Sequence, residues 1–390
     1  MVTMTSADNA LKSLYLGVVA EQLNTGVNPL LAKIKQTTQD VWGKEIRRVA
    51  QYGISGGIGA GTEDGALPKP SANMYDQFVL TLKNLYGTIE ISDKAIRASE
   101  NNVGAFVNLL NAEMEGLLKA SSLNFGRMLF GDGSGVLATV ETASNGVITC
   151  NSVKNIVEGM IIDYVTTDGV RLENFSGRII TSVDRANKTF TTTGSALSSI
   201  NLEKGTYVTL QNSYNKEITG LKAIFSDKGT LYGLDRSLHK WLIPYMKDSV
   251  GEITENTIQT AIDTLEENTG SKVNFIICSS GVKRAYQQHL ATYRRNIDYM
   301  DLHGGYKALS YNGIPVISDR FCPEGTMYLL NTDDFVLHQL CDWKWLEGED
   351  GRVLKQVAGK PVYTATLVKY ADLICTRPCG QAMLSGITEA

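Results

Sequence analysis

Residues 45 to 91 combine a strand, a long glycine-rich tip and a returning strand, and this segment most constrains how the chain can fold. The outgoing limb runs from Lys44 to Tyr52, the tip GISGGIGAGTEDGALPKPSANM begins at Gly53, and the return limb ends at Ser92. A tip so poor in apolar residues cannot bury enough surface to order itself, and glycine loses the most backbone entropy on ordering. We therefore expect a neighbouring subunit to order the tip, which indicates assembly rather than catalysis.

Length and composition set the broad class of protein. The 390 residues leave room for roughly two or three structural units. Hydrophobic and charged contents of 43% and 20% are typical of soluble globular proteins, and a net charge of -4 gives no general attraction to nucleic acid or anionic membranes. No apolar run predicts a membrane span, and the N-terminus lacks a secretory signal pattern. The six scattered cysteines are expected to be reduced thiols in a protein made in the cytoplasm.

Periodic patterns lie on both sides of the glycine-rich segment. Residues 8 to 23 have the pattern of an amphipathic helix in an N-terminal arm. A second helix is predicted from Val103 to Phe130, because apolar positions recur at spacings of three and four, and it would span roughly 40 Å. Residues 132 to 215 contain the short strand-like runs GVITC, MIIDYVT, GRIITSVD, KTFTTT and TYVTLQ. Their regular spacing predicts a small all-β barrel or sandwich inserted into the chain.

Alternating helices and strands return after Glu217. The predicted elements are a helix over 254–268 ended by Gly270, a buried strand over 272–278, a helix over 281–295 capped by Ser279 or Ser280, a hairpin turning at Asn312-Gly313, and long strands over 360–378. We expect the apolar runs 325–331 and 334–340 to continue the same sheet.

Two glycine patterns resemble catalytic or phosphate-binding motifs. Gly53 to Gly57 match G-x-S-x-G, the nucleophile elbow of α/β-hydrolases, which makes Ser55 a candidate esterase nucleophile. An elbow needs a helix directly after it, whereas residues 62 to 65 continue as loop, so a flexible tip is favoured. Residues 57 to 61 and 131 to 135 resemble phosphate-binding loops. Neither opens a helix nor ends in Lys-Ser/Thr, so both are favoured as turns.

Cysteine and histidine side chains near the C-terminus offer a possible metal site. Cys375 and Cys379, together with Cys341 and His338, have the ligand types that suit zinc. The paired C-x-x-C spacing of common zinc sites is absent, so structural cysteines are favoured and no metal or other cofactor is expected.

Charged residues give three further candidates. Asp263, Glu266 and Glu267 lie on one predicted helix face, where a solvated surface is favoured over acid–base chemistry. The basic pairs Arg47-Arg48 and Arg294-Arg295 are consistent with an interface, with a wall facing nucleic acid, or with an exposed helix end or strand.

Several short segments together resemble the major capsid proteins of tailed bacteriophages. They are GLDRSLHKWLIPY at 233–245, SGVKRAY at 280–286, YNGIPV at 311–316, GTMYLL at 325–330 and NTD at 331–333. The order of arm, extended loop, long helix, α/β region and closing sheet is also similar to that family. The resemblance covers nearly the whole chain and implies an α+β, Hong Kong 97-type capsid fold with an inserted β domain. Encapsulin shells share this fold.

The resemblance also implies a division of the chain into domains. The implied units are an N-terminal arm (1–45), an extended loop lying over a neighbouring subunit (46–91), a peripheral domain with the spine helix (92–130), a β insertion domain (131–220), a mainly axial domain (221–345), and returning strands of the peripheral and axial domains (346–390).

The function implied by the resemblance is structural, with no enzyme activity. The chain would assemble into hexamers and pentamers that form the icosahedral head of a virion around double-stranded DNA, built in the bacterial cytoplasm without a membrane. Implied partners are its own copies, scaffolding, portal and decoration proteins, and non-specifically bound DNA. The expected interface residues are Arg47, Arg48, Gly56, Gly57, Gly59, Gly61, Pro68, Lys69 and Pro70. An encapsulin-like, cargo-enclosing shell protein is the alternative, and an esterase using Ser55 is a more remote one.

Overall fold

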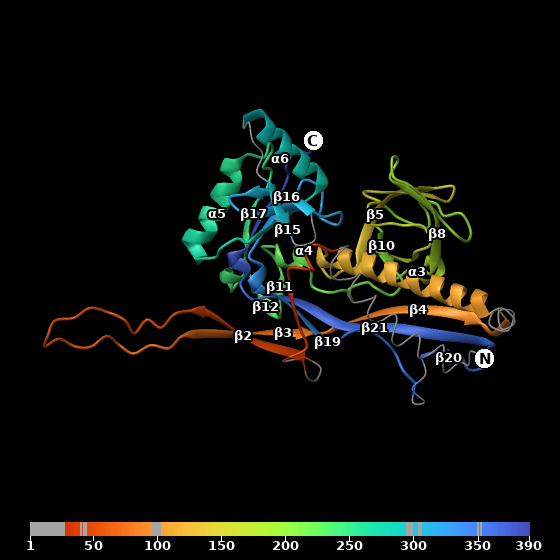
Figure 1. Ribbon diagram of the computed structural model, residues 1–390, viewed down its shortest axis with the longest axis horizontal. Helices are drawn as coiled ribbons and strands as arrows, with labels where there is room; N and C mark the ends of the chain where they lie inside the picture. Colours follow the sequence, from red (N-terminus) through yellow and green to blue (C-terminus); the bar gives the residue numbers. More distant parts are fainter. Residues whose placement is uncertain are drawn as a thin grey trace.

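The computed structural model describes residues 28–39, 41, 45–94, 103–293, 299–302, 306–348, 351 and 353–390. The helix predicted over residues 8 to 23 and the pair Arg294-Arg295 lie outside them. The described residues form two larger sheets, a closed barrel and a long hairpin that projects from the body (Figure 1). Among them, no helix has the length and apolar character needed to cross a lipid bilayer.

A five-stranded sheet joins strands from both halves of the chain. It consists of β1 (Lys35–Thr37), β4 (Lys83–Ser92), β19 (Phe335–Trp345), β20 (Lys355–Gln356) and β21 (Val362–Cys375). The order runs β1, β19, β21, β20, and β4 also pairs with β21; only the β1–β19 pair is parallel. Strand β21 therefore holds the sheet together, and the long strand predicted within residues 360 to 378 is confirmed.

Helix α3 (Val103–Leu129) packs on one face of this sheet, where the sequence predicts the long helix (Figure 1). Its buried side chains Met114, Leu118 and Phe125 recur at helical spacing. Gly87 of β4 allows a close approach, because a Cβ atom there would lie only 2.8 Å from Leu117 of the helix. Helix and sheet therefore share one apolar core.

A buried ammonium group lies between α3 and the sheet. The Nζ atom of Lys369 donates hydrogen bonds to Gln339 Oε1 at 2.7 Å and Asp342 Oδ1 at 2.6 Å, and it lies 5.3 Å from the centre of the Phe125 ring. Burial lowers the pKa of Lys369, although Asp342 stabilises its charged form. An ammonium group without such partners would be costly to bury, so these contacts also specify how β19 lies against β21.

A seven-stranded sheet forms the second unit. In order, its strands are β13 (Tyr245–Lys247), β22 (Ala382–Leu384), β18 (Met327–Leu330), β14 (Phe275–Cys278), β17 (Ile314–Ser318), β16 (Tyr306–Tyr311) and β15 (Tyr299–Leu302). Helices α5 (Glu255–Thr269) and α6 (Ser280–Tyr293) share an apolar core with one face. The alternate residues Phe275 and Ile277 of β14 belong to the core shared with α3. All four residues of β14 are buried because both faces of the sheet are covered.

Local signals for these elements are confirmed. The side chain of Thr254 accepts a hydrogen bond from the Thr257 N–H at the start of α5, and Gly270 ends that helix with a φ of 64°. The Ser279 hydroxyl accepts from the Val282 N–H and caps α6. Asn312-Gly313, with φ values of 49° and 81°, turns the hairpin between β16 and β17.

One predicted strand placement is wrong. The run 334–340 does not continue the sheet of the run 325–331: β18 pairs with β14 and β22, whereas β19 pairs with β1 and β21 of the other sheet. The short 3-10 helix Thr332–Asp334 redirects the chain between them, with the Asn331 side chain accepting from the Asp333 N–H. β18 and the first half of β19 are buried on both faces, so their pattern does not say which sheet each one joins.

The inserted β segment forms a closed barrel. Its strands are β5 (Val136–Ser144), β6 (Val147–Cys150), β7 (Ile161–Val165), β8 (Arg178–Asp184), β9 (Thr189–Thr192) and β10 (Tyr207–Leu210). It encloses a separate apolar core, so the barrel of the two predicted alternatives is confirmed. At the junction of the barrel with α3, Arg127 and Glu217 form a buried ion pair at 2.5 Å. Lys154 also donates a hydrogen bond to the carbonyl oxygen of Cys322, which lies between β17 and β18, at 2.7 Å.

Two glycines of α3 make a matched test of its packing. A Cβ atom at Gly126 would lie 2.0 Å from Asn28 Oδ1 and 2.5 Å from Phe321, whereas one at Gly116 meets no atom within 4 Å. Gly126→Ala is expected to destabilise the folded subunit by about 1–3 kcal/mol through overpacking. Gly116→Ala is expected to stabilise it by up to about 1 kcal/mol through helix propensity. Denaturant unfolding of both variants measures the difference, and equal effects would contradict this packing.

Candidate inter-subunit interface

The glycine-rich segment forms a two-stranded hairpin. Strands β2 (Glu45–Gly53) and β3 (Met74–Thr81) pair antiparallel, with Ile46 opposite Leu80 and Arg48 opposite Phe78. The hairpin extends well beyond the rest of the molecule, to the left of Figure 1. Only Leu82 separates β3 from β4, so the direction of the hairpin is set by the five-stranded sheet.

Aromatic side chains anchor the base of the hairpin. The Trp241 ring stacks on Tyr52, with 5.4 Å between ring centres, and on Phe78, with 5.7 Å. The Val79 N–H donates to the Tyr232 carbonyl oxygen at 2.9 Å, so the backbone of β3 is also attached to the body. Phe78 is fully buried. The base is thus a packed part of the subunit.

The tip differs from the base, because residues 54 to 73 form no strand or helix and most of them are exposed. The side chains of Ile54, Ile58 and Leu67 are 77%, 79% and 91% exposed. The predicted interface residues Gly56, Gly59, Gly61, Pro68, Lys69 and Pro70 are all exposed here, and Gly57 is half-buried. These exposed apolar side chains make the tip a candidate contact surface.

The glycines of the tip allow its two limbs to lie close together. A Cβ atom at Gly59 would lie 3.1 Å from the Pro68 ring, and one at Gly57 would lie 3.3 Å from the Ser71 nitrogen. None of the predicted interface glycines has a positive φ. These glycines are therefore needed because they have no side chain, and not because the backbone is left-handed.

Ser55 lies in the tip and has the bonding of a structural residue. Its hydroxyl donates to the Ser71 carbonyl oxygen at 2.8 Å, and its N–H donates to Asn73 Oδ1 at 2.9 Å. The chain continues after it as an extended limb and not as a helix. A nucleophile elbow needs the helix and a neighbouring base, so this geometry does not support the esterase alternative.

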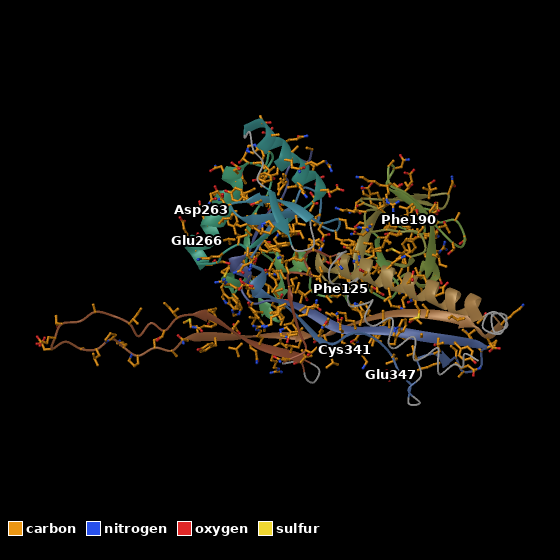
Figure 2. The ribbon with its side chains drawn as sticks, viewed as in Figure 1. Phe125, Phe190, Asp263, Glu266, Cys341 and Glu347 are labelled. Atoms are coloured by element: carbon orange, nitrogen blue, oxygen red, sulfur yellow. The ribbon has the colours of Figure 1, made fainter. Side chains whose placement is uncertain are left out.

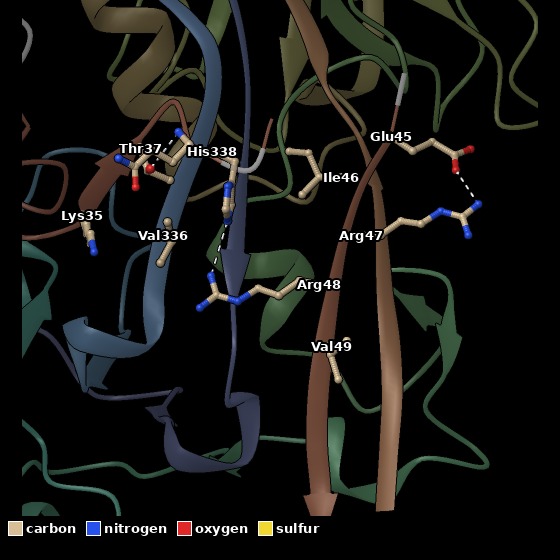
Figure 3. Close-up of a pocket in the computed structure, with 10 residues that line it drawn as sticks. Lys35, Thr37, Glu45, Ile46, Arg47, Arg48, Val49, Val336 and His338 are labelled. Atoms are coloured by element: carbon tan, nitrogen blue, oxygen red, sulfur yellow. Dashed lines mark hydrogen bonds and ion pairs between the residues drawn. The ribbon is translucent and has the colours of Figure 1, made fainter. Parts of the chain in front are cut away.

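A basic groove of about 590 Å³ lies at the base of the hairpin (Figure 3). One side is strand β2 from Glu45 to Val49, and the other carries Lys35, Thr37 and Gln39 together with Val336 and His338 of β19. Across it, Arg48 Nη1 lies 3.4 Å from His338 Nε2. Arg47 pairs at 3.2 Å with Glu45 of the same strand, and both side chains point away from His338 (Figure 3).

Sequence reasoning chose Arg47 and Arg48 for this interface but missed Lys35 and His338. These residues come from β1, β2 and β19, and β2 and β19 are almost three hundred residues apart in sequence. The parallel pairing of β1 with β19 brings them together, and no local pattern signals it.

The zinc-type residues do not form a metal site in the part of the chain that the structure describes. No group of three or more His, Cys, Asp or Glu side chains there is arranged to hold a metal ion. Burial raises the pKa of the Cys375 and Cys379 thiols, which opposes the thiolate form that zinc binds. On β19, His338 is opposite Asp372, and Cys341 is opposite Tyr370.

The remaining candidates are turns and solvated side chains. Gly133 and Gly135 have φ values of 83° and 75° in the turn that enters the barrel, and the loop at 57–61 continues as extended chain. Asp263 and Glu266 lie on the outer side of α5 (Figure 2), where they are exposed. Neither arrangement resembles a catalytic site.

No protein-family model and no curated protein matches the sequence. Three solved structures are similar to nearly the whole chain. A chain of the capsid asymmetric unit of cyanophage A-1(L) has a TM-score of 0.57 and 13% identity, covering 93% of each chain. The SrpI encapsulin of Synechococcus elongatus PCC 7942 has a TM-score of 0.48 and 10% identity, covering 95% of each chain. The capsid of Myoviridae phage XM1 has a TM-score of 0.46 and 9% identity, covering 93% of this chain and 92% of that one.

The similarity to the cyanophage structure shows that this chain has the Hong Kong 97-type capsid fold. The α+β fold implied by the sequence resemblance is confirmed.

Trp241 gives a test of how the hairpin is anchored. Trp241→Ala removes the ring contacts with Tyr52, Phe78 and His239. We expect it to cost roughly 2 kcal/mol, less than for a fully buried tryptophan because Trp241 is half-buried. Amide hydrogen exchange in β2 and β3 should become faster, because the base loses its packing. Trp241→Phe, which keeps an aromatic ring, is the control. Unchanged exchange in the alanine variant would contradict the anchor.

Proposed function

We propose that this chain is a major capsid protein, a structural subunit that assembles into hexamers and pentamers of an icosahedral phage head around double-stranded DNA. Its fold supports this proposal. The single observation that carries the assembly role is the projecting hairpin, whose base is packed and whose tip exposes Ile54, Ile58 and Leu67 without cover from the described part of its own chain. A neighbouring subunit supplies that cover.

In this proposal the chain acts through shape and contact, without turnover. Each hairpin lies over the next subunit, and repeating that heterologous contact closes a ring. Scaffolding, portal and decoration proteins are the other proposed partners, and DNA contact is non-specific because it involves phosphate charge alone. Assembly takes place in the bacterial cytoplasm, and the product is the capsid of a virion.

Electron microscopy of the purified protein tests the proposal. We expect uniform polyhedral particles or ring-shaped capsomers, and nuclease-protected double-stranded DNA in particles isolated from phage-producing cells. Particles that enclose a specific protein cargo and no DNA would instead indicate the encapsulin-like alternative. A stable monomer under all assembly conditions would contradict both.

Deletion of Gly56 to Ala72 tests the hairpin directly. The subunit should fold and stay soluble, because the packed base is untouched, but it should not form closed shells.

Two aliphatic side chains with almost the same exposure give a finer comparison. Leu67 is 91% exposed at the hairpin tip, and Ile200 is 93% exposed on the barrel. Leu67→Ser should raise the concentration needed for assembly about tenfold, because it removes roughly 1.5 kcal/mol of apolar burial per contact. Ile200→Ser should leave it unchanged. Equal assembly by both variants would contradict the role proposed for the tip.

A further inference from the structure

We infer that the acidic turn at the apex of one hairpin, formed by Glu63 and Asp64, binds in the basic groove of a neighbouring copy, whose positive charges are those of Lys35 and Arg48. The inference rests on the proposed function, because it names the partner surface for the hairpin tip.

The groove has an excess of positive charge. Its cationic side chains are Lys35 and Arg48. Figure 3 shows Glu45 and Arg47, which pair with each other, pointing from β2 away from this space, and Arg48 Nη1 lies 3.4 Å from His338 Nε2. The Lys35 ammonium group is exposed and has no ion pair with any described residue. The groove therefore fits a ligand with one or two negative charges.

The groove is also open to a protein segment. Strand β2 pairs only with β3 in the part of the chain that the structure describes, so its other edge is free of strand pairing and lines the groove. Unpaired N–H and C=O groups on a strand edge are suited to contacts with another chain. Figure 3 shows Arg48 reaching across this space from β2 toward His338.

The apex of the hairpin has the matching charge. The Gly65 N–H donates to the Thr62 carbonyl oxygen at 3.1 Å, which forms a tight turn with Glu63 and Asp64 at its two central positions. Both side chains are exposed, and neither has an ion pair with a described residue. The limbs that lead to this turn face each other, with Gly59 close to Pro68 and Gly61 close to Ala66, so two adjacent carboxylates are presented at the end of the hairpin.

Distance requires the groove and the apex to come from different copies. About eighteen residues separate Glu45 from Glu63, which corresponds to roughly 60 Å of extended chain. The apex therefore lies far from the groove of its own chain. Each copy offers one apex and one groove, so the contact is heterologous and its repetition closes a ring.

Charge reversal is the main experiment. Glu63→Lys with Asp64→Lys reverses the apex, and Lys35→Glu with Arg48→Glu reverses the groove. Each reversed protein should fold, as judged by thermal unfolding, and should need about tenfold more protein to assemble, because attraction becomes repulsion. The defect should shrink in 1 M salt, where the screening length falls to about 3 Å. Reversing all four residues in one chain should restore assembly.

A matched control separates this contact from general charge effects. Asp168→Lys with Glu203→Lys changes the net charge by the same amount as the apex reversal, but at exposed barrel residues. This variant should assemble like the unmodified protein. Mixing the apex-reversed and groove-reversed proteins should give six-membered rings with alternating subunits, but no closed shells, because a five-membered ring cannot alternate.

Chemical cross-linking gives a second readout without charge reversal. A carbodiimide joins a carboxylate to a lysine that it touches. In particles assembled from a mixture of 14N- and 15N-labelled protein, it should link Lys35 to Glu63 or Asp64 between the two labels. Lys35→Arg keeps the charge and should assemble normally, but it should abolish this cross-link.

The outcomes distinguish the inference from the proposed function. Normal assembly of either reversed protein, failure of the four-residue reversal to restore assembly, or absence of the cross-link from intact particles would overturn the apex–groove contact. Failure of the unmodified protein to assemble at all would overturn the proposed function instead.

Discussion

Pairing of β21 on both of its edges is the interaction on which the rest of the structure depends. Strand β4 lies along one edge and β19 along the other, and α3 covers one face of the resulting sheet. The buried Lys369 ties β19, β21 and α3 together, because its ammonium group needs the oxygens of Gln339 and Asp342 and the Phe125 ring. Since β3 runs almost directly into β4, the same sheet also aims the hairpin away from the body.

The hairpin combines a rigid base with an uncovered tip. Stacking of Trp241 on Tyr52 and Phe78 holds the base, whereas the tip has few contacts beyond those between its own limbs. This division suits the proposed assembly, in which the packed base would keep the arm in position and the tip would lose its remaining freedom only on contact with a neighbour. In the inferred contact, the acidic apex of one subunit and the basic groove of the next have complementary charges.

Local sequence signals predicted local structure well. Gly270 ends α5 as expected, and Asn312-Gly313 forms the expected hairpin turn. The evenly spaced short strands predicted a barrel or a sandwich, and the structure has the barrel, although β5 was not among the runs identified. The run 334–340 was recognised as apolar but assigned to the wrong sheet, because a strand buried on both faces has no period that distinguishes one sheet from another. The site was predicted in part: Arg47 and Arg48 were chosen from β2, while Lys35 and His338 were not.

The sequence by itself determined most of the helices and strands and the presence of a long arm with a glycine-rich tip. These follow from periodicity, capping residues and glycine content, which act over a few neighbouring residues. Only the tertiary structure decided which strands pair, which aromatic rings anchor the arm, and that Lys35 and His338 line one groove with Arg48. Those contacts join residues hundreds of positions apart, and they form because buried strands and charges must find partners wherever the fold provides them.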